Sequence, residues 1–112
     1  MKALRDCPGS NYHDYLDFKI IDKNGEDVGA LFSMWSDQAT GQFEFMGFKT
    51  GWLVGKNYIM PVKGVQVDEE QKLVQVPYAV EFLKDAPTFA PEAEVTAEDE
   101  DRIKDYYDEE MP

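Results

Sequence analysis

The chain is short of the residues that most enzyme active sites and metal centres require. Its 112 residues include one cysteine, Cys7, and one histidine, His13. A single cysteine excludes an internal disulfide and any multi-cysteine zinc site. Ser-His or Cys-His catalysis would depend on His13, and no nucleophile motif lies near it. We therefore expect no enzyme activity, no cofactor and no metal, and we interpret His13 as a surface residue.

Basic residues are also scarce, with 11 Lys and Arg against 23 Asp and Glu and a net charge of −12. Residues 92–112 hold ten acidic and two basic residues, which places −8 of that charge in the last part of the chain. Nucleic acids and anionic membranes bind clusters of Lys and Arg. Neither is expected as a direct partner.

No hydrophobic run is long enough for a transmembrane helix, and the first twelve residues lack the apolar core of a secretory signal. A chain with one cysteine also fits a reducing compartment. These absences favour a cytoplasmic location.

The hydrophobic content of 43% and the aromatic content of 13% are sufficient for one packed domain. Residues 28–61 hold both tryptophans and four of the seven phenylalanines, in apolar runs broken at 36–41 and at 50–51. That rhythm predicts a β-meander with short turns. The run over 28–36 is apolar in both phases, which is typical of a strand covered on both sides.

Other strands and turns follow from local patterns. Residues 16–20 alternate apolar with charged side chains, and Asn24-Gly25 suits a tight hairpin turn, so residues 22–27 are a turn rather than a calcium loop. The apolar phase slips at Gly47, which predicts a β-bulge. Residues 51–56 are interpreted as a wide loop with Trp52 as an aromatic plug.

The second half of the chain adds a hairpin and two helices. Two alternating segments, 65–67 and 74–76, flank a polar turn, and residues 79–84 are long enough for one or two helical turns. Residues 89–91 are interpreted as an extended connector.

Thr96 is the predicted N-cap of an acidic helix over residues 97–107. Residues 98–101 are interpreted as a solvated helix start rather than a cation site. The i,i+4 spacing predicts ion pairs of Glu98 with Arg102 and of Glu100 with Lys104.

The aromatic side chains raise the sharpest functional question, because they exceed what a small core needs and aromatic residues often anchor interfaces. The interface candidates are Trp35, Phe48, Trp52, Ile103, Tyr106 and Tyr107. The alternative is that the C-terminal helix folds back and buries these aromatic residues within the same chain.

Several segments, taken in order, resemble the PRC-barrel domain family. They are VGALFSMWSD at 28–37, TG at 40–41, GWLVGK at 51–56, IMP at 59–61, VQVD at 65–68, VQVP at 74–77, AP at 86–87, and EDE at 98–100 with YY at 106–107. The family includes the cytoplasmic domain of the photosynthetic reaction centre H subunit and the C-terminal domain of a ribosome-maturation factor. The resemblance implies a small β-barrel of about six strands that has no catalytic site and docks onto larger assemblies.

The expected fold is mainly β: a closed or partly closed barrel of antiparallel strands, with a short helix and a C-terminal acidic helix. Residues 1–14 are a lead-in, 15–86 the barrel, and 87–112 the connector and acidic helix. The expected function is a non-enzymatic interaction or assembly module that self-associates, as a homo-oligomer, or docks onto a protein partner through an aromatic surface. The alternative is a small-ligand-binding barrel with a pocket near Trp52.

Overall fold

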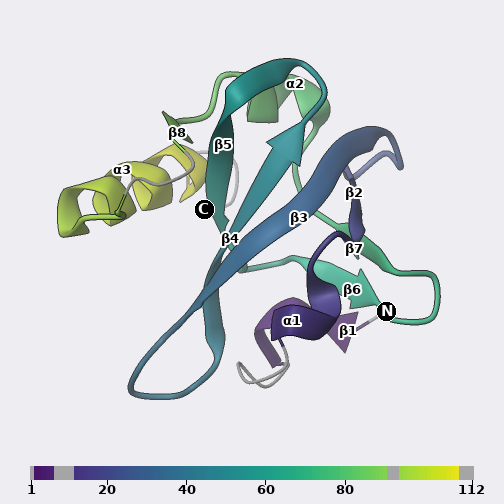
Figure 1. Ribbon diagram of the computed structural model, residues 1–112, viewed down its shortest axis with the longest axis horizontal. Helices are drawn as coiled ribbons and strands as arrows, with labels where there is room; N and C mark the ends of the chain where they lie inside the picture. The colour runs from purple at the N-terminus through teal and green to yellow at the C-terminus, as the bar shows by residue number, and fades with distance from the viewer. Residues whose placement is uncertain (1, 7–11, 91–93, 109–112) are drawn as a thin grey trace.

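The protein is organised around a curled mixed β-sheet. The computed structural model describes residues 2–6, 12–90 and 94–108. The strand order is β1-β6-β7-β2-β3-β4-β5-β8 (Figure 1). The strands are β1 (Lys2–Ala3), β2 (Lys19–Ile21), β3 (Asp27–Ser36), β4 (Phe43–Thr50), β5 (Leu53–Pro61), β6 (Gln66–Asp68), β7 (Leu73–Gln75) and β8 (Thr88–Phe89). The helices are η1 (Leu4–Asp6), α1 (Tyr12–Tyr15), α2 (Val80–Lys84) and α3 (Ala97–Asp108).

The predicted meander is confirmed, since β2, β3, β4 and β5 are successive antiparallel neighbours. The β6-β7 hairpin is confirmed as well. One pairing differs from the expected antiparallel sheet, because β2 runs parallel to β7, with Ile20 opposite Val74. Within the described residues no pairing joins β8 to β1, so hydrogen bonds do not close the sheet into a complete barrel.

The predicted bulge lies beside Gly47, but the extra residue belongs to the partner strand. Leu31 pairs with Phe48 and Ser33 pairs with Gly47, which leaves Phe32 of β3 as the additional residue. A Cβ at position 47 would lie 2.6 Å from the Ser33 Oγ and 3.2 Å from two ring carbons of Trp35. Glycine therefore allows the Trp35 ring to lie close against the β4 backbone.

The prediction of a wide loop over residues 51–56 is wrong, because β5 already begins at Leu53. Thr50 pairs with Leu53 across a short turn, and the register then shifts before Phe48 pairs with Tyr58. Gly55 has a φ of +83° within the unpaired part of β5, a conformation that glycine adopts without steric cost. The strand thus continues past a break that looks like a loop in the sequence.

Residues 2–4, from the segment interpreted as a lead-in, pack onto the sheet. Strand β1 pairs with β6, and the Leu4 N–H donates a hydrogen bond of 2.9 Å to the Val65 carbonyl. The Leu4 side chain is completely buried in the core. His13 is exposed on α1, whereas Cys7 lies outside the described residues.

A buried carboxylate, Asp22, joins the β2-β3 turn to α2. It accepts backbone hydrogen bonds from Asn24 and Glu26, both 2.8 Å, and one of 3.1 Å from Val80, the first residue of α2. Burial raises the pKa of Asp22, but these bonds, together with one from Gly25, lower it, and the net direction is downward. Asp22 therefore caps a helix that lies 58 residues further along the chain.

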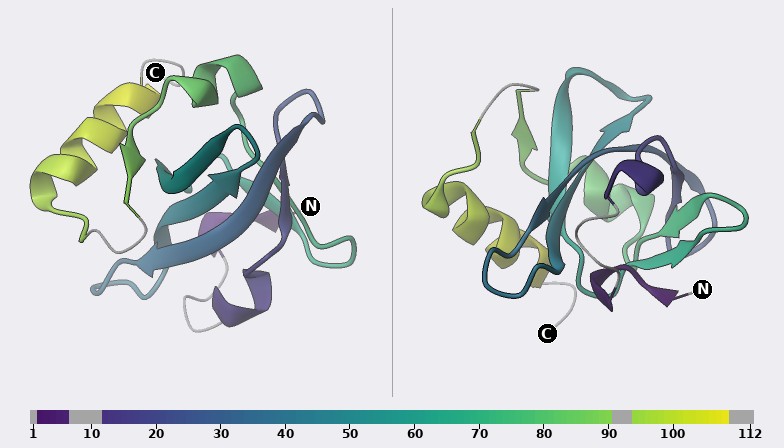
Figure 2. Two further views of the ribbon diagram at one scale, coloured as in Figure 1. Left: turned by 45° about the horizontal axis from the view of Figure 1, so that its top comes forward. Right: turned by 60° about the horizontal axis from the view of Figure 1, so that its bottom comes forward.

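The C-terminal helix docks against the chain's own sheet (Figure 2). Ile103 and Tyr107 are buried, Tyr106 is half-buried, and Tyr106 donates its hydroxyl hydrogen to the Phe82 carbonyl. The Thr96 N-cap is confirmed by reciprocal bonds, from the Asp99 N–H to Thr96 Oγ1 (3.2 Å) and from the Thr96 N–H to Asp99 Oδ2 (3.1 Å). Among the described residues, no helix combines the length and apolar character that a membrane crossing requires.

Candidate interaction groove

The six interface candidates from the sequence divide into three buried and three partly exposed side chains. Phe48, Ile103 and Tyr107 are at most 1% exposed, so the chain's own atoms already cover them. Trp35, Trp52 and Tyr106 are half-buried. The structure therefore leaves three of the six able to contact a partner directly.

Tyr106 and Tyr107 belong to a set of four stacked and tilted rings, which we call the aromatic cluster: Tyr78, Phe82, Tyr106 and Tyr107. Phe82 stacks on Tyr106 at 4.5 Å between ring centroids and on Tyr78 at 5.3 Å, while Tyr107 contacts Tyr78 at 5.0 Å. Burial raises the pKa of Tyr107, and the neighbouring tyrosines act in the same direction. The cluster fixes α3 to α2 and to the segment before it.

Trp52 is connected to the end of α2 through Tyr58. Its indole Nε1 donates a 2.8 Å hydrogen bond to the Tyr58 hydroxyl, which in turn donates one of 3.2 Å to the Lys84 carbonyl. The Lys84 Nζ lies 5.3 Å from the centroid of the Trp52 ring. Trp52 lines none of the four cavities described within residues 2–6, 12–90 and 94–108, and a pocket near it stays a prediction.

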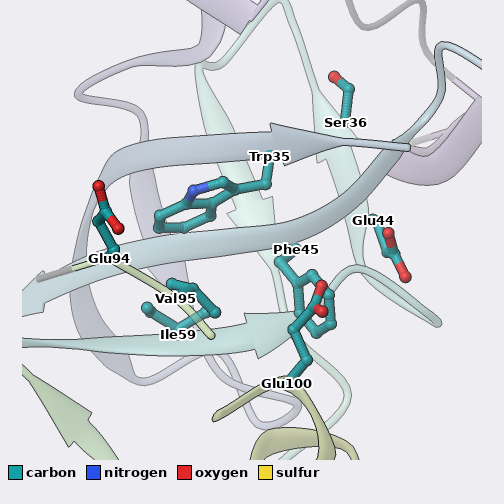
Figure 3. Close-up of a pocket in the computed structure, with 8 residues that line it drawn as sticks. All are labelled: Trp35, Ser36, Glu44, Phe45, Ile59, Glu94, Val95 and Glu100. Atoms are coloured by element: carbon teal, nitrogen blue, oxygen red, sulfur yellow. The ribbon is translucent and has the colours of Figure 1, made fainter. Parts of the chain in front are cut away.

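Trp35 has a different environment, at the wall of a cavity of about 360 Å³ (Figure 3). We call this cavity the Trp35 groove. Its lining residues are Trp35, Ser36, Glu44, Phe45, Ile59, Glu94, Val95 and Glu100. The indole N–H of Trp35 has no acceptor among the described residues, unlike that of Trp52.

The groove forms where three strands meet the start of the C-terminal helix. Trp35 and Ser36 come from the end of β3, Glu44 and Phe45 from the start of β4, and Ile59 from β5. The opposite wall comes from the connector before α3 and from the first turn of that helix. In Figure 3 the Trp35 ring lies above Ile59 and Val95, Glu100 approaches Phe45, and Ser36 points away from them.

The groove continues on both sides into smaller cavities. A space of about 140 Å³ shares Trp35 and Ile59 with it and extends past Gly47 to Phe89 of β8. A second space, of about 250 Å³, shares Glu44 and extends to Arg5, Lys63 and Lys104. The hollowed surface therefore has an apolar end, an acidic middle and a basic end.

The ion pairs of α3 differ from those predicted by i,i+4 spacing. Arg102 contacts Asp99, with 3.8 Å between Nη1 and Oδ1, and Lys104 contacts Glu44 of β4, with 3.6 Å between Nζ and Oε1. Lys104 thereby joins the helix to the sheet beside the groove. The predicted Glu100–Lys104 pair is not found because the docked helix brings Lys104 to Glu44 of β4.

These features define a small, curled, mainly β domain with a groove on its outer face. The chain belongs to the PRC-barrel domain family, whose model matches residues 9–83. A comparison with curated proteins gave no match. The family match includes Trp35, Phe45 and Ile59 but ends before the connector and α3, so one wall of the groove lies outside the matched segment.

Sequence patterns indicate Trp35 as a candidate but not its neighbours in the groove. Ile59 and Phe45 belong to predicted strands with no signal of a binding role, and Glu94 and Val95 lie in an acidic stretch. One signal was available, because Val95 is the only large aliphatic residue between positions 91 and 102. An isolated apolar residue before a helix N-cap often packs back onto the fold.

Proposed function

We propose that this protein is a non-enzymatic interaction module that docks onto a protein partner through the Trp35 groove. The observation that carries the proposal is the contrast between the two tryptophans. Both are half-buried, but the indole N–H of Trp52 is bonded to Tyr58 and its ring lies beside Lys84, whereas Trp35 lines an apolar and acidic cavity. A half-exposed indole over an aliphatic floor is the kind of side chain that dominates binding energy at protein interfaces.

The partner is either a second copy of the chain or another protein. Self-association was expected from the short chain and the excess of aromatic residues. In the structure three of the candidates are core residues, and Trp52 and Tyr106 are bonded to their own chain, so the proposal of self-association depends on the Trp35 groove. Docking onto a larger complex is the role that the family resemblance implied for members of this family.

The test combines solution mass with a position-specific crosslinker in the full chain. A photoreactive residue at Ser36, which is exposed at the rim of the groove, is compared with one at Val54, which is 93% exposed on β5 and lines none of the described cavities. Light scattering over a dilution series reports the mass of the same proteins with and without Trp35→Ala.

Two results support the proposal. A dimer whose mass falls to that of a monomer on Trp35→Ala makes the partner a second copy, and a discrete crosslinked species from position 36, but not from position 54, makes it another protein. A monomer at every concentration with the same crosslinks from both positions contradicts the proposal.

A second candidate function is the binding of a small molecule in the same cavity. The volume of about 360 Å³ supports it, because ligand pockets commonly occupy about 300–1,000 Å³. The site is then at Trp35 rather than at Trp52. A metabolite that raises the melting temperature of the full chain, and not that of Trp35→Ala, would favour this candidate over protein docking.

A further inference from the structure

The lysines of this chain show a repeated contact with aromatic rings. Lys49 lies over Phe32 at 4.3 Å from the ring centroid, Lys84 over Trp52 at 5.3 Å, and Lys104 over Phe45 at 5.6 Å. All three lie within the about 6 Å at which an ammonium group is attracted to the face of a ring. Among the described residues, no such cation lies over Trp35, the partly exposed aromatic side chain of the groove.

The Lys104 contact, beside the groove, shows how two of the residues that line the groove hold a cation. Its ammonium group lies over the Phe45 ring and 3.6 Å from the Glu44 carboxylate, so a ring face and a carboxylate hold it together. Trp35 provides a ring face as Phe45 does, and an indole ring attracts a cation more strongly than a phenyl ring. Glu94 and Glu100 of the same cavity supply the carboxylates.

The charge of the cavity wall also favours a cationic ligand. Three carboxylates and no basic side chain line the groove, and Lys104 pairs with one of the three, Glu44. Glu94 and Glu100 form no ion pair with a described residue, and the cavity is too large for a bare ion, since one water occupies about 30 Å³. Ile59 and Val95 add an aliphatic floor that suits the methylene groups of a long side chain.

We propose that the Trp35 groove binds a lysine or arginine side chain carried by an apolar peptide segment of a partner protein. The cationic group lies over the Trp35 ring, with Glu94 and Glu100 on either side, and the apolar neighbours of that residue contact Ile59 and the space toward Phe89 (Figure 3). The inference rests on the proposed docking function and specifies the chemistry of the partner. It involves residues on both sides of the boundary of the family match.

The test is a selection of random displayed peptides on the full chain, with removal of peptides that also bind the Trp35→Ala variant. Trp35→Leu is used in parallel, because it keeps an apolar side chain beside Gly47 and removes only the aromatic face. We expect the selected peptides to share one Lys or Arg with apolar neighbours. Replacing that Lys by norleucine, which keeps the aliphatic chain without the charge, should weaken binding roughly tenfold in fluorescence polarisation.

Matched charge variants separate a defined site from general attraction to an acidic protein. Glu94→Gln with Glu100→Gln should weaken binding of the selected peptide several-fold at about 0.15 M salt. Glu98→Gln with Asp101→Asn removes the same charge from exposed positions of α3 that do not line the groove, and should change binding less than about twofold.

The outcomes distinguish the two proposals. Selection of neutral apolar peptides, equal binding of the norleucine peptide, or equal weakening by both charge variants overturns the cationic partner and leaves docking at Trp35 intact. If no peptide distinguishes the full chain from both Trp35 variants, the cationic partner is overturned; if the mass and crosslinking test is negative as well, the docking function is overturned with it.

Discussion

The two tryptophans lie on two differently built sides of one small sheet. On the closed side, Trp52 and the aromatic cluster hold α2 and α3 in place through ring contacts and hydroxyl hydrogen bonds. On the open side, Trp35 lies beside a cavity with carboxylates at its rim. The same residue type therefore stabilises the fold in one place and remains available for binding in the other, depending on whether its own chain supplies the neighbours.

The largest expected effect is on the closed side, from truncation of Tyr107. Tyr107→Ala removes a buried ring and should lower the free energy of unfolding by about 3–5 kcal/mol in a denaturant titration, because the cavity left behind adds to the lost burial. Arg102→Ala on the exposed face of α3 serves as the control and should cost less than about 0.5 kcal/mol. A loss for Tyr107→Ala below about 1 kcal/mol would show that α3 is not docked in solution.

The second effect concerns Asp22, which holds the start of α2 and therefore Phe82. Asp22→Ala leaves three backbone N–H groups without a charged acceptor and empties a buried position, and should cost about 2–4 kcal/mol. The exposed Asp14→Ala is the control, with little change in the unfolding midpoint. An equally small change in both variants would contradict the capping role.

Asp22 also gives the stability a pH dependence of known sign. Its pKa is lower in the folded protein, so its stabilising contribution is full above the unfolded-state pKa, about 3.9, and is lost as the pH falls toward the folded value. Asp22→Asn should therefore flatten the acid side of a stability profile measured from pH 7 to pH 2.5. A slope as steep as that of the unchanged protein would mean that other carboxylates account for it.

An intermediate loss of stability is expected at Gly47, where the β4 backbone lies close to the Trp35 ring. Gly47→Ala places a Cβ 2.6 Å from Ser33 Oγ and 3.2 Å from the Trp35 ring, and should cost about 1–3 kcal/mol while shifting the tryptophan fluorescence. Adding Ser33→Ala should recover part of the loss by removing the closer contact. Gly51→Ala meets nothing within 4 Å and should be nearly neutral, so an equal cost at both glycines would contradict this explanation.

The smallest effects separate two adjacent hydroxyl groups of the aromatic cluster. Tyr106→Phe loses the bond to the Phe82 carbonyl and should cost about 0.5–1.5 kcal/mol. The hydroxyl of Tyr107 is buried and has no partner among the described residues, so Tyr107→Phe should be neutral or stabilising by up to about 1 kcal/mol. The reverse order in thermal melts would show that the hydroxyl partners are exchanged in solution.

Local patterns in the sequence were reliable where a short segment determines its own geometry. The Asn24-Gly25 turn, the β6-β7 hairpin and the Thr96 cap were all predicted correctly, since each depends on residues only a few positions apart. The wide loop over residues 51–56 was wrong because its two glycines indicate a break, whereas Leu53 already pairs with Thr50 and begins β5. Strand β8 was missed because two residues carry no period.

The sequence by itself determined a mainly β domain, the alternating strands and the capped acidic helix. Only the tertiary structure decided which aromatic residues are covered. Phe48, Ile103 and Tyr107 became core and Trp35 became the wall of a groove because burial depends on partners distant in sequence, and Glu94 and Val95 reach Trp35 from about 60 positions away. Composition gives the number of aromatic side chains, whereas the path of the chain determines which of them remain available to a partner.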